Sequence, residues 1–144
     1  MRTFVIDGGA AATFGWAWLL ATVALALHVA DEATHDFLAW YNPRALRIRQ
    51  RLHGVPFPPT FTFLPWLLGL GAGVLLLAAL TPLAYGGVSR LRPLAYVLAT
   101  IHIANGLLHV VGSLVARRAV PGVLSAPLLL ASGSWLGYAA ARLP

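Results

Sequence analysis

The chain has 144 residues, of which 59% are hydrophobic and 10% are charged, and its mean hydropathy is +0.78. Soluble domains carry about 25% charged residues, so this composition excludes a soluble protein and predicts one integral membrane domain. The absence of cysteine excludes disulfides and thiolate metal sites. The net charge of +6 comes from arginines at the edges of apolar segments. This arrangement favours contact with anionic lipid over binding to nucleic acid.

The first apolar segment, at about 11–40, is longer than one membrane crossing requires. About 20 apolar residues are enough to cross the hydrocarbon core. The helix is expected to end at Asn42-Pro43, because the residue before a proline disfavours helical geometry. No small-residue cleavage site precedes a polar mature domain, so the segment is predicted to be a true spanning helix and not a signal peptide.

Three further apolar segments, at about 61–80, 93–116 and 123–141, predict an all-α fold, a bundle of four transmembrane helices. The glycines of 69–73 include a Gly-xxx-Gly spacing, which predicts tight helix packing. A short interfacial basic helix is expected between the first two spans, where a row of arginines would bind lipid headgroups: Arg44, Arg47, Arg49 and Arg51. Four short helices make a thin bundle, so a homodimer is a further expectation.

The distribution of arginines sets the expected orientation. The first and third links hold Arg44, Arg47, Arg49, Arg51, Arg117 and Arg118, and the other side holds Arg2, Arg90, Arg92 and Arg142. This bias favours cytoplasmic first and third links. The protein is therefore expected to be a multi-pass protein of the inner, cytoplasmic membrane of the cell, with both termini facing outward.

The end of the first span carries an unusual concentration of ionisable side chains. Three of the four acidic residues, Asp31, Glu32 and Asp36, lie there beside His28 and His35. A charged side chain at the centre of a spanning helix costs about 2.5–3.5 kcal/mol, so such residues indicate a functional site. At 100° per residue, His28, Glu32 and His35 share one face of a helix, and the two aspartates flank it.

A second polar group lies on the third predicted span, where His102, Asn105 and His109 share one face. The first and third spans are expected to run in the same direction. Both polar groups then lie at similar distances before the ends of their helices. The two groups are therefore predicted to meet at one depth, in the cytoplasmic half of the bilayer.

Imidazole and carboxylate side chains together predict a site for a divalent transition metal, iron or zinc. The candidate ligands are His28, Glu32, His35, His102 and His109. Asp31, Asp36 and Asn105 are expected to orient these ligands by hydrogen bonds. The Glu32-x-x-His35 spacing is typical of di-iron helix bundles, although the third span supplies no carboxylate. Three ligands and an open position would instead make a mononuclear catalytic zinc site.

The pattern favours a membrane metalloenzyme that acts on a lipophilic substrate or lipid. Two irons would support oxidation or hydroxylation. Zinc would support hydrolysis, with Glu32 or Asp31 activating a metal-bound water. One alternative is a haem-binding electron carrier, in which His28 with His102, for example, would provide the two axial ligands. Another is a metal or proton translocator, since carboxylate–histidine chains can relay protons.

Three motifs, His28-x-x-Asp-Glu32, Asn105-x-x-x-His109 and Arg118-x-x-Pro-Gly122, together resemble the HXXEE-domain family of small bacterial integral membrane proteins. The family is named for a His-x-x-Glu-Glu motif, and the resemblance covers about residues 15 to 130. This chain has Asp31 where the family has its first glutamate. The resemblance supports the motif residues as a site and implies no particular reaction.

Overall fold

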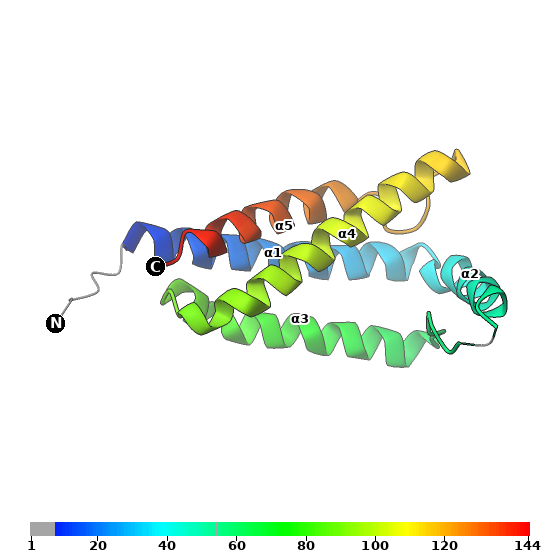
Figure 1. Ribbon diagram of the computed structural model, residues 1–144, viewed down its shortest axis with the longest axis horizontal. Helices are drawn as coiled ribbons and strands as arrows, with labels where there is room; N and C mark the ends of the chain where they lie inside the picture. Colours follow the sequence, from blue (N-terminus) through cyan, green and yellow to red (C-terminus); the bar gives the residue numbers. More distant parts are fainter. Residues whose placement is uncertain (1–7, 54) are drawn as a thin grey trace.

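The computed structural model describes residues 8–53 and 55–144, and the prediction of an all-α fold is confirmed for these residues (Figure 1). Five α-helices and one short 3₁₀ helix follow one another along the chain: α1 (Gly8–Thr34), α2 (Phe37–Arg51), α3 (Phe63–Tyr85), η1 (Ser89–Leu91), α4 (Arg92–Ala116) and α5 (Ala126–Ala141).

The prediction of four membrane-spanning helices is wrong for the last one. α5 has 16 residues. At about 1.5 Å per residue it extends about 24 Å, which is less than the roughly 30 Å hydrocarbon core. Among the described residues, three helices are long and apolar enough to cross a membrane: α1, α3, and α4 together with η1. These three helices indicate a membrane protein.

α1 forms the centre of the arrangement, because it packs against α3 and against α5, and α5 in turn packs along α4 (Figure 1). α1 and α4 run in the same direction, and α3 and α5 run in the opposite one. The expected common direction of the first and third spans is therefore confirmed. The start of α1 and the C-terminus lie at one end of the bundle, and α2 lies at the other.

The core between these helices is built largely from small residues around a few large ones. Phe14 and Trp18 of α1 are fully buried among alanines of α1, α3, α4 and α5. The indole Nε1 of Trp18 donates a hydrogen bond of 2.9 Å to the backbone O of Leu77 in α3. Small residues allow helix backbones to approach closely, which is the usual basis of helix association in membranes.

The close approach of α4 and α5 does not use the glycines that the sequence singled out. A Cβ atom added to Gly69, Gly71 or Gly73 would have no neighbour within 4 Å, so tight packing of these glycines within the chain was a wrong prediction. Instead, a Cβ on Gly106 of α4 would lie 2.8 Å from Leu130 Cγ. A Cβ on Gly133 of α5 would lie 2.9 Å from the backbone O of Ala99 in α4.

α1 ends at Thr34, and not at Trp40 as predicted. Asp36 has the left-handed backbone conformation (φ 54°), which breaks the helix before α2 begins. Side chains cover the last backbone carbonyls of α1. The Thr34 hydroxyl donates to Ala30 O at 2.8 Å, and His35 Nδ1 lies 2.8 Å from Asp31 O.

Pro43 lies inside α2, so the prediction that Asn42-Pro43 ends a helix was also wrong. The Asn42 side chain pairs with the backbone of Phe61, donating to its O at 2.9 Å and accepting from its N at 3.1 Å. The Tyr41 hydroxyl donates to Pro59 O at 3.0 Å. These long-range bonds hold the first half of α2 against the start of α3. The row of arginines occupies the second half of α2.

Gly133→Ala is expected to destabilise the bundle, because the new methyl group would lie 2.8 Å from His102 Cβ and 2.9 Å from Ala99 O. Overpacking of this kind costs about 1–3 kcal/mol. Thermal unfolding of the detergent-solubilised protein should therefore shift downward by several degrees. Gly69→Ala is the matched control. It meets nothing within 4 Å and improves helix propensity, so equal losses for both variants would contradict the packing described here.

Candidate metal centre

Three buried side chains from two helices converge where α1 and α4 lie close together. His28 and Glu32 are one turn apart on α1, and His109 comes from α4. Glu32 Oε1 lies 3.5 Å from His28 Nε2 and 3.2 Å from His109 Nε2. One ligand atom from each residue lies within 4.8 Å of the other two. The three residues are 1%, 5% and 3% exposed, so no bulk water competes for these atoms.

The spacing of these atoms suits a single small cation. Zinc binds imidazole nitrogen and carboxylate oxygen at about 2.0–2.2 Å, which places two ligands of a tetrahedral ion about 3.3–3.5 Å apart. The contacts of 3.2 and 3.5 Å from Glu32 to the two histidines are close to this separation. The centre could therefore accept an ion with little rearrangement of Glu32.

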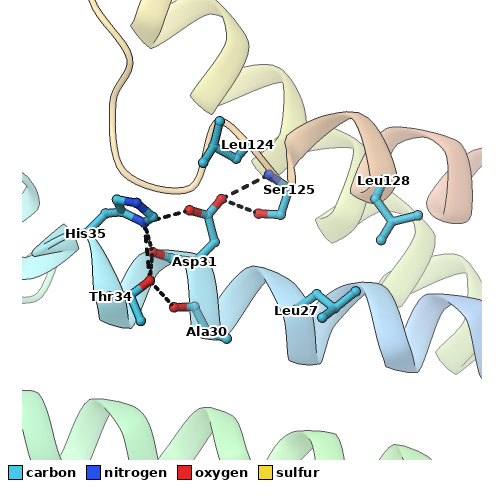
Figure 2. Close-up of a pocket in the computed structure, with 8 residues that line it drawn as sticks. All are labelled: Leu27, Ala30, Asp31, Thr34, His35, Leu124, Ser125 and Leu128. Carbon is cyan, nitrogen blue, oxygen red and sulfur yellow. Dashed lines mark hydrogen bonds and ion pairs between the residues drawn. The ribbon is translucent and has the colours of Figure 1, made fainter.

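The outer nitrogen of His28 is held by a chain of hydrogen bonds that ends at Asp31. Asp31 Oδ2 accepts from the backbone N of Ser125 at 2.9 Å and from its hydroxyl at 2.7 Å (Figure 2). The Ser125 hydroxyl oxygen lies 2.8 Å from His28 Nδ1. Because the hydroxyl proton is directed to Asp31, His28 Nδ1 donates to the serine oxygen. The lone pair of His28 then lies on Nε2, the nitrogen that faces Glu32.

Asn105 of α4 closes the cluster from another direction. Its side-chain nitrogen lies 2.9 Å from His28 Nε2. With the lone pair on Nε2, the Asn105 amide donates and the imidazole accepts. The contact confirms the prediction that the polar groups of the first and third spans meet at one depth.

His109 is positioned mainly by packing. A Cβ on Gly122 would lie 2.6 Å from His109 Cε1 and 2.8 Å from its Nδ1, so the link between α4 and α5 passes directly over the ring. Gly122 has φ +87°, a conformation that residues with side chains rarely adopt. The short distance to the His109 ring and the positive φ therefore each require glycine at position 122. His109 Nδ1 itself is buried and has no hydrogen-bond partner among the described residues.

Three of the predicted site residues lie outside this cluster. His35 is exposed, and its Nδ1 lies 2.9 Å from Asp31 Oδ1, on the opposite side of Asp31 from Ser125 (Figure 2). Asp36 is an exposed residue of the turn between α1 and α2. His102 is buried 3.3 Å from the Ser132 hydroxyl, and its Nε2 has no partner in the described part of the chain. Asp31 reaches the cluster only through Ser125.

Two functional residues, Ser125 and Gly122, were not among the predicted site residues. Ser125 directly precedes Ala126-Pro127, and serine followed by proline is typical of a helix start. That pattern could have marked Ser125 as the residue immediately before α5, but not as a partner of residues 94 and 97 positions earlier in the chain. Gly122 is part of the Arg118-x-x-Pro-Gly122 motif, but the motif alone does not explain why this position is a glycine.

A cavity of about 270 Å³ adjoins the cluster on the α3 side. Its wall includes Glu32, Phe37 at the start of α2, and Phe63 and Trp66 at the start of α3. A second, apolar cavity of about 580 Å³ lies along the same pair of helices, between Ala26 and Val29 of α1 and the Leu67–Leu75 stretch of α3. The two cavities therefore lie about one helical turn apart along α1 and α3.

These features define a small helical membrane protein with a buried His–Glu–His centre. A family described as "Protein of unknown function with HXXEE motif" matches residues 18–136, so the chain belongs to that family. The resemblance noted from the sequence is thereby confirmed. Comparisons with curated proteins and with solved structures found no match. The family gives no reaction, and the two matching motif residues, His28 and Glu32, both lie in the cluster.

Ser125→Ala is expected to weaken metal binding by about 10- to 100-fold, the usual effect of losing a hydrogen bond behind a metal-bound imidazole. Titration of the purified protein with Zn²⁺ against a chromophoric chelator measures the affinity. Ser134→Ala, on the exposed side of α5, is the matched control and should bind Zn²⁺ as the wild type does. Unchanged affinity in Ser125→Ala would show that the Asp31–Ser125 pair does not support the centre.

Proposed function

We propose that this protein is a membrane-embedded, metal-dependent enzyme that acts on a lipophilic substrate, with one divalent metal ion bound by His28, Glu32 and His109. The observation that carries the proposal is the convergence of three buried potential ligand atoms within 4.8 Å. Ionisable side chains at this depth cost free energy unless they are paired or bind an ion. Three protein ligands leave a further coordination position for substrate or water, which is the pattern of catalytic sites.

The ligand set favours one ion over two. Di-iron bundles use four carboxylates, whereas Glu32 is the one carboxylate in this cluster among residues 8–53 and 55–144. Two imidazoles and one carboxylate are shared by catalytic zinc sites and by mononuclear non-haem iron sites. Iron and zinc are therefore the two metals to test. The ion would polarise a substrate oxygen or activate a water molecule.

The residues of the chain would act around that ion in distinct ways. Glu32 and the two histidines bind it. Asp31 fixes the orientation and proton of His28 through Ser125, and is a positioning residue in this proposal. The cavity beside Glu32 would hold the reacting part of the substrate, next to the aromatic side chains of its wall.

The substrate is proposed to be lipophilic because of the space that leads to Glu32. The apolar cavity along α1 and α3 begins one helical turn from the cavity at Glu32, since Val29 precedes Glu32 on α1 and Leu67 follows Trp66 on α3. An alkyl chain could lie between the helices with its polar end at the metal.

Haem ligation by His28 together with His109 is disfavoured by the same geometry. The ring centroids of His28 and His109 lie 4.8 Å apart with an edge-to-face angle of 72°, which leaves no room for a macrocycle between them. A carboxylate also occupies the space between their nitrogens.

We further propose that the protein resides in the cytoplasmic membrane, with the α2 end of the bundle at the cytoplasmic face. The support is the arginine bias, since the α2 end carries Arg44, Arg47, Arg49, Arg51, Arg117 and Arg118. Positively charged links tend to stay in the cytoplasm. Arg2, which counted for the other side, lies outside the described residues.

Protein purified without chelators or nickel resin is expected to contain about one iron or zinc ion per chain by elemental analysis. His28→Ala and His109→Ala should each lose most of this metal, because two remaining ligands hold an ion weakly. His53→Ala removes an exposed histidine outside the cluster and is the matched control. Wild-type protein without stoichiometric metal would overturn the proposal.

Gly71→Leu is expected to obstruct the apolar cavity, whose wall includes Gly71, without disturbing the fold, because nothing lies within 4 Å of its added Cβ. Labelling by a photoreactive long-chain alcohol should fall severalfold in this variant, with the labelled peptides mapped by mass spectrometry. Gly69→Leu also meets no neighbour and is outside the cavity wall, so it is the control. Equal labelling of both variants would remove the support for an alkyl substrate in this space.

A further inference from the structure

A pocket of about 400 Å³ lies at the α2 end of the bundle, apart from the metal centre. It is formed where the start of α2 meets the link between α4 and α5. Its wall includes His35, Asp36, Trp40, Arg44 and Arg118. None of these residues is a ligand in the proposed centre.

Arg44 is held in one position within this pocket. Its guanidinium lies over the ring of Trp40, 4.2 Å from the ring centroid. One of its terminal nitrogens also donates to the backbone O of Trp40. The side chain is therefore oriented in advance, and its remaining N–H donors are available to a ligand.

Arg44 and Arg118 lie in the wall of one pocket, and neither forms an ion pair with a carboxylate of the described residues. Burial, followed by the charges of Arg47 and Arg118, lowers the pKa of Arg44 below its ordinary value. Every ion pair within residues 8–53 and 55–144 involves a histidine, so Asp36 pairs with neither arginine despite lying in the same pocket wall. Two guanidinium groups near one space, without an anionic partner, indicate that an anion from outside the chain completes the site.

The position of the pocket identifies the source of that anion. Arg118 follows the end of α4, one of the three helices long enough to cross a membrane. α2 carries exposed Leu46 and Ile48 among its arginines, and exposed Leu52 directly follows it, which is the composition of a helix that lies in the membrane interface. The pocket is thus level with lipid headgroups.

We propose that the Arg44–Arg118 pocket binds the phosphate group of an anionic phospholipid. Arg44 and Arg118 donate hydrogen bonds to the phosphate oxygens, and the fork of each guanidinium matches their spacing. The bound headgroup bridges α2 and the α4–α5 link. It thereby fixes the link that carries Gly122 and leads to Ser125.

Native mass spectrometry of the full-length protein in detergent, titrated with phosphatidylglycerol, tests this site. The double variant Arg44→Gln with Arg118→Gln should bind the lipid about tenfold or more weakly, because it loses charge-assisted hydrogen bonds. The double variant Arg49→Gln with Arg117→Gln removes the same charge from residues outside the pocket wall and should change binding less than about twofold. Unchanged thermal unfolding of both variants confirms that they are folded.

Three results would overturn the proposal. Equal weakening of phosphatidylglycerol binding in both double variants would mean that the lipid is attracted by the overall positive charge and not bound at a specific site. Equal binding of phosphatidylcholine and phosphatidylglycerol to the wild type would mean no selection for an anionic lipid. Displacement of phosphatidylglycerol by millimolar inorganic phosphate would assign the pocket to a soluble oxyanion and not to a membrane lipid.

Discussion

The buried carboxylate of Glu32, 3.5 and 3.2 Å from two imidazoles, is the constraint on which the α2 end of the bundle depends. A charge removed from water is tolerated only with partners in close geometry. Those partners fix the depth of α4 relative to α1. They also require the α4–α5 link to pass over His109, where only glycine fits. Asp31 then ties the start of α5 to α1 through Ser125. Two adjacent carboxylates thus set the register of three helices.

The two acidic residues of the motif are adjacent in sequence and perform opposite tasks. Glu32 points into the bundle, toward His28 and His109, whereas Asp31 points to the start of α5. The helical periodicity explains this division, because adjacent residues are about 100° apart around a helix and so point in different directions. The departure from the family pattern at Asp31 is also accounted for in this chain. Its short side chain reaches both the backbone and the hydroxyl of Ser125 at 2.7–2.9 Å.

Much of this arrangement could be predicted from the sequence, and the rest depended on tertiary contacts. Apolar length and helical spacing were enough to predict the all-α fold, the common direction of α1 and α4, and the meeting of the polar groups of these two helices, but they predicted one spanning helix too many. The break at Thr34 could not be predicted, because it depends on side-chain capping and on the Asn42–Phe61 pairing. The roles of Ser125 and Gly122 depend on the path of a link, which no local pattern encodes.

The hydrogen bond from Asn105 to His28 Nε2 has a consequence for the order of assembly. The amide occupies the same lone pair that an ion would use, so both ring nitrogens of His28 have partners in the absence of an ion. Binding of the proposed ion would then require this single amide to rotate away from His28 after the bundle has formed. Maturation would then be a local exchange of partners in an already folded protein, and not a step coupled to folding.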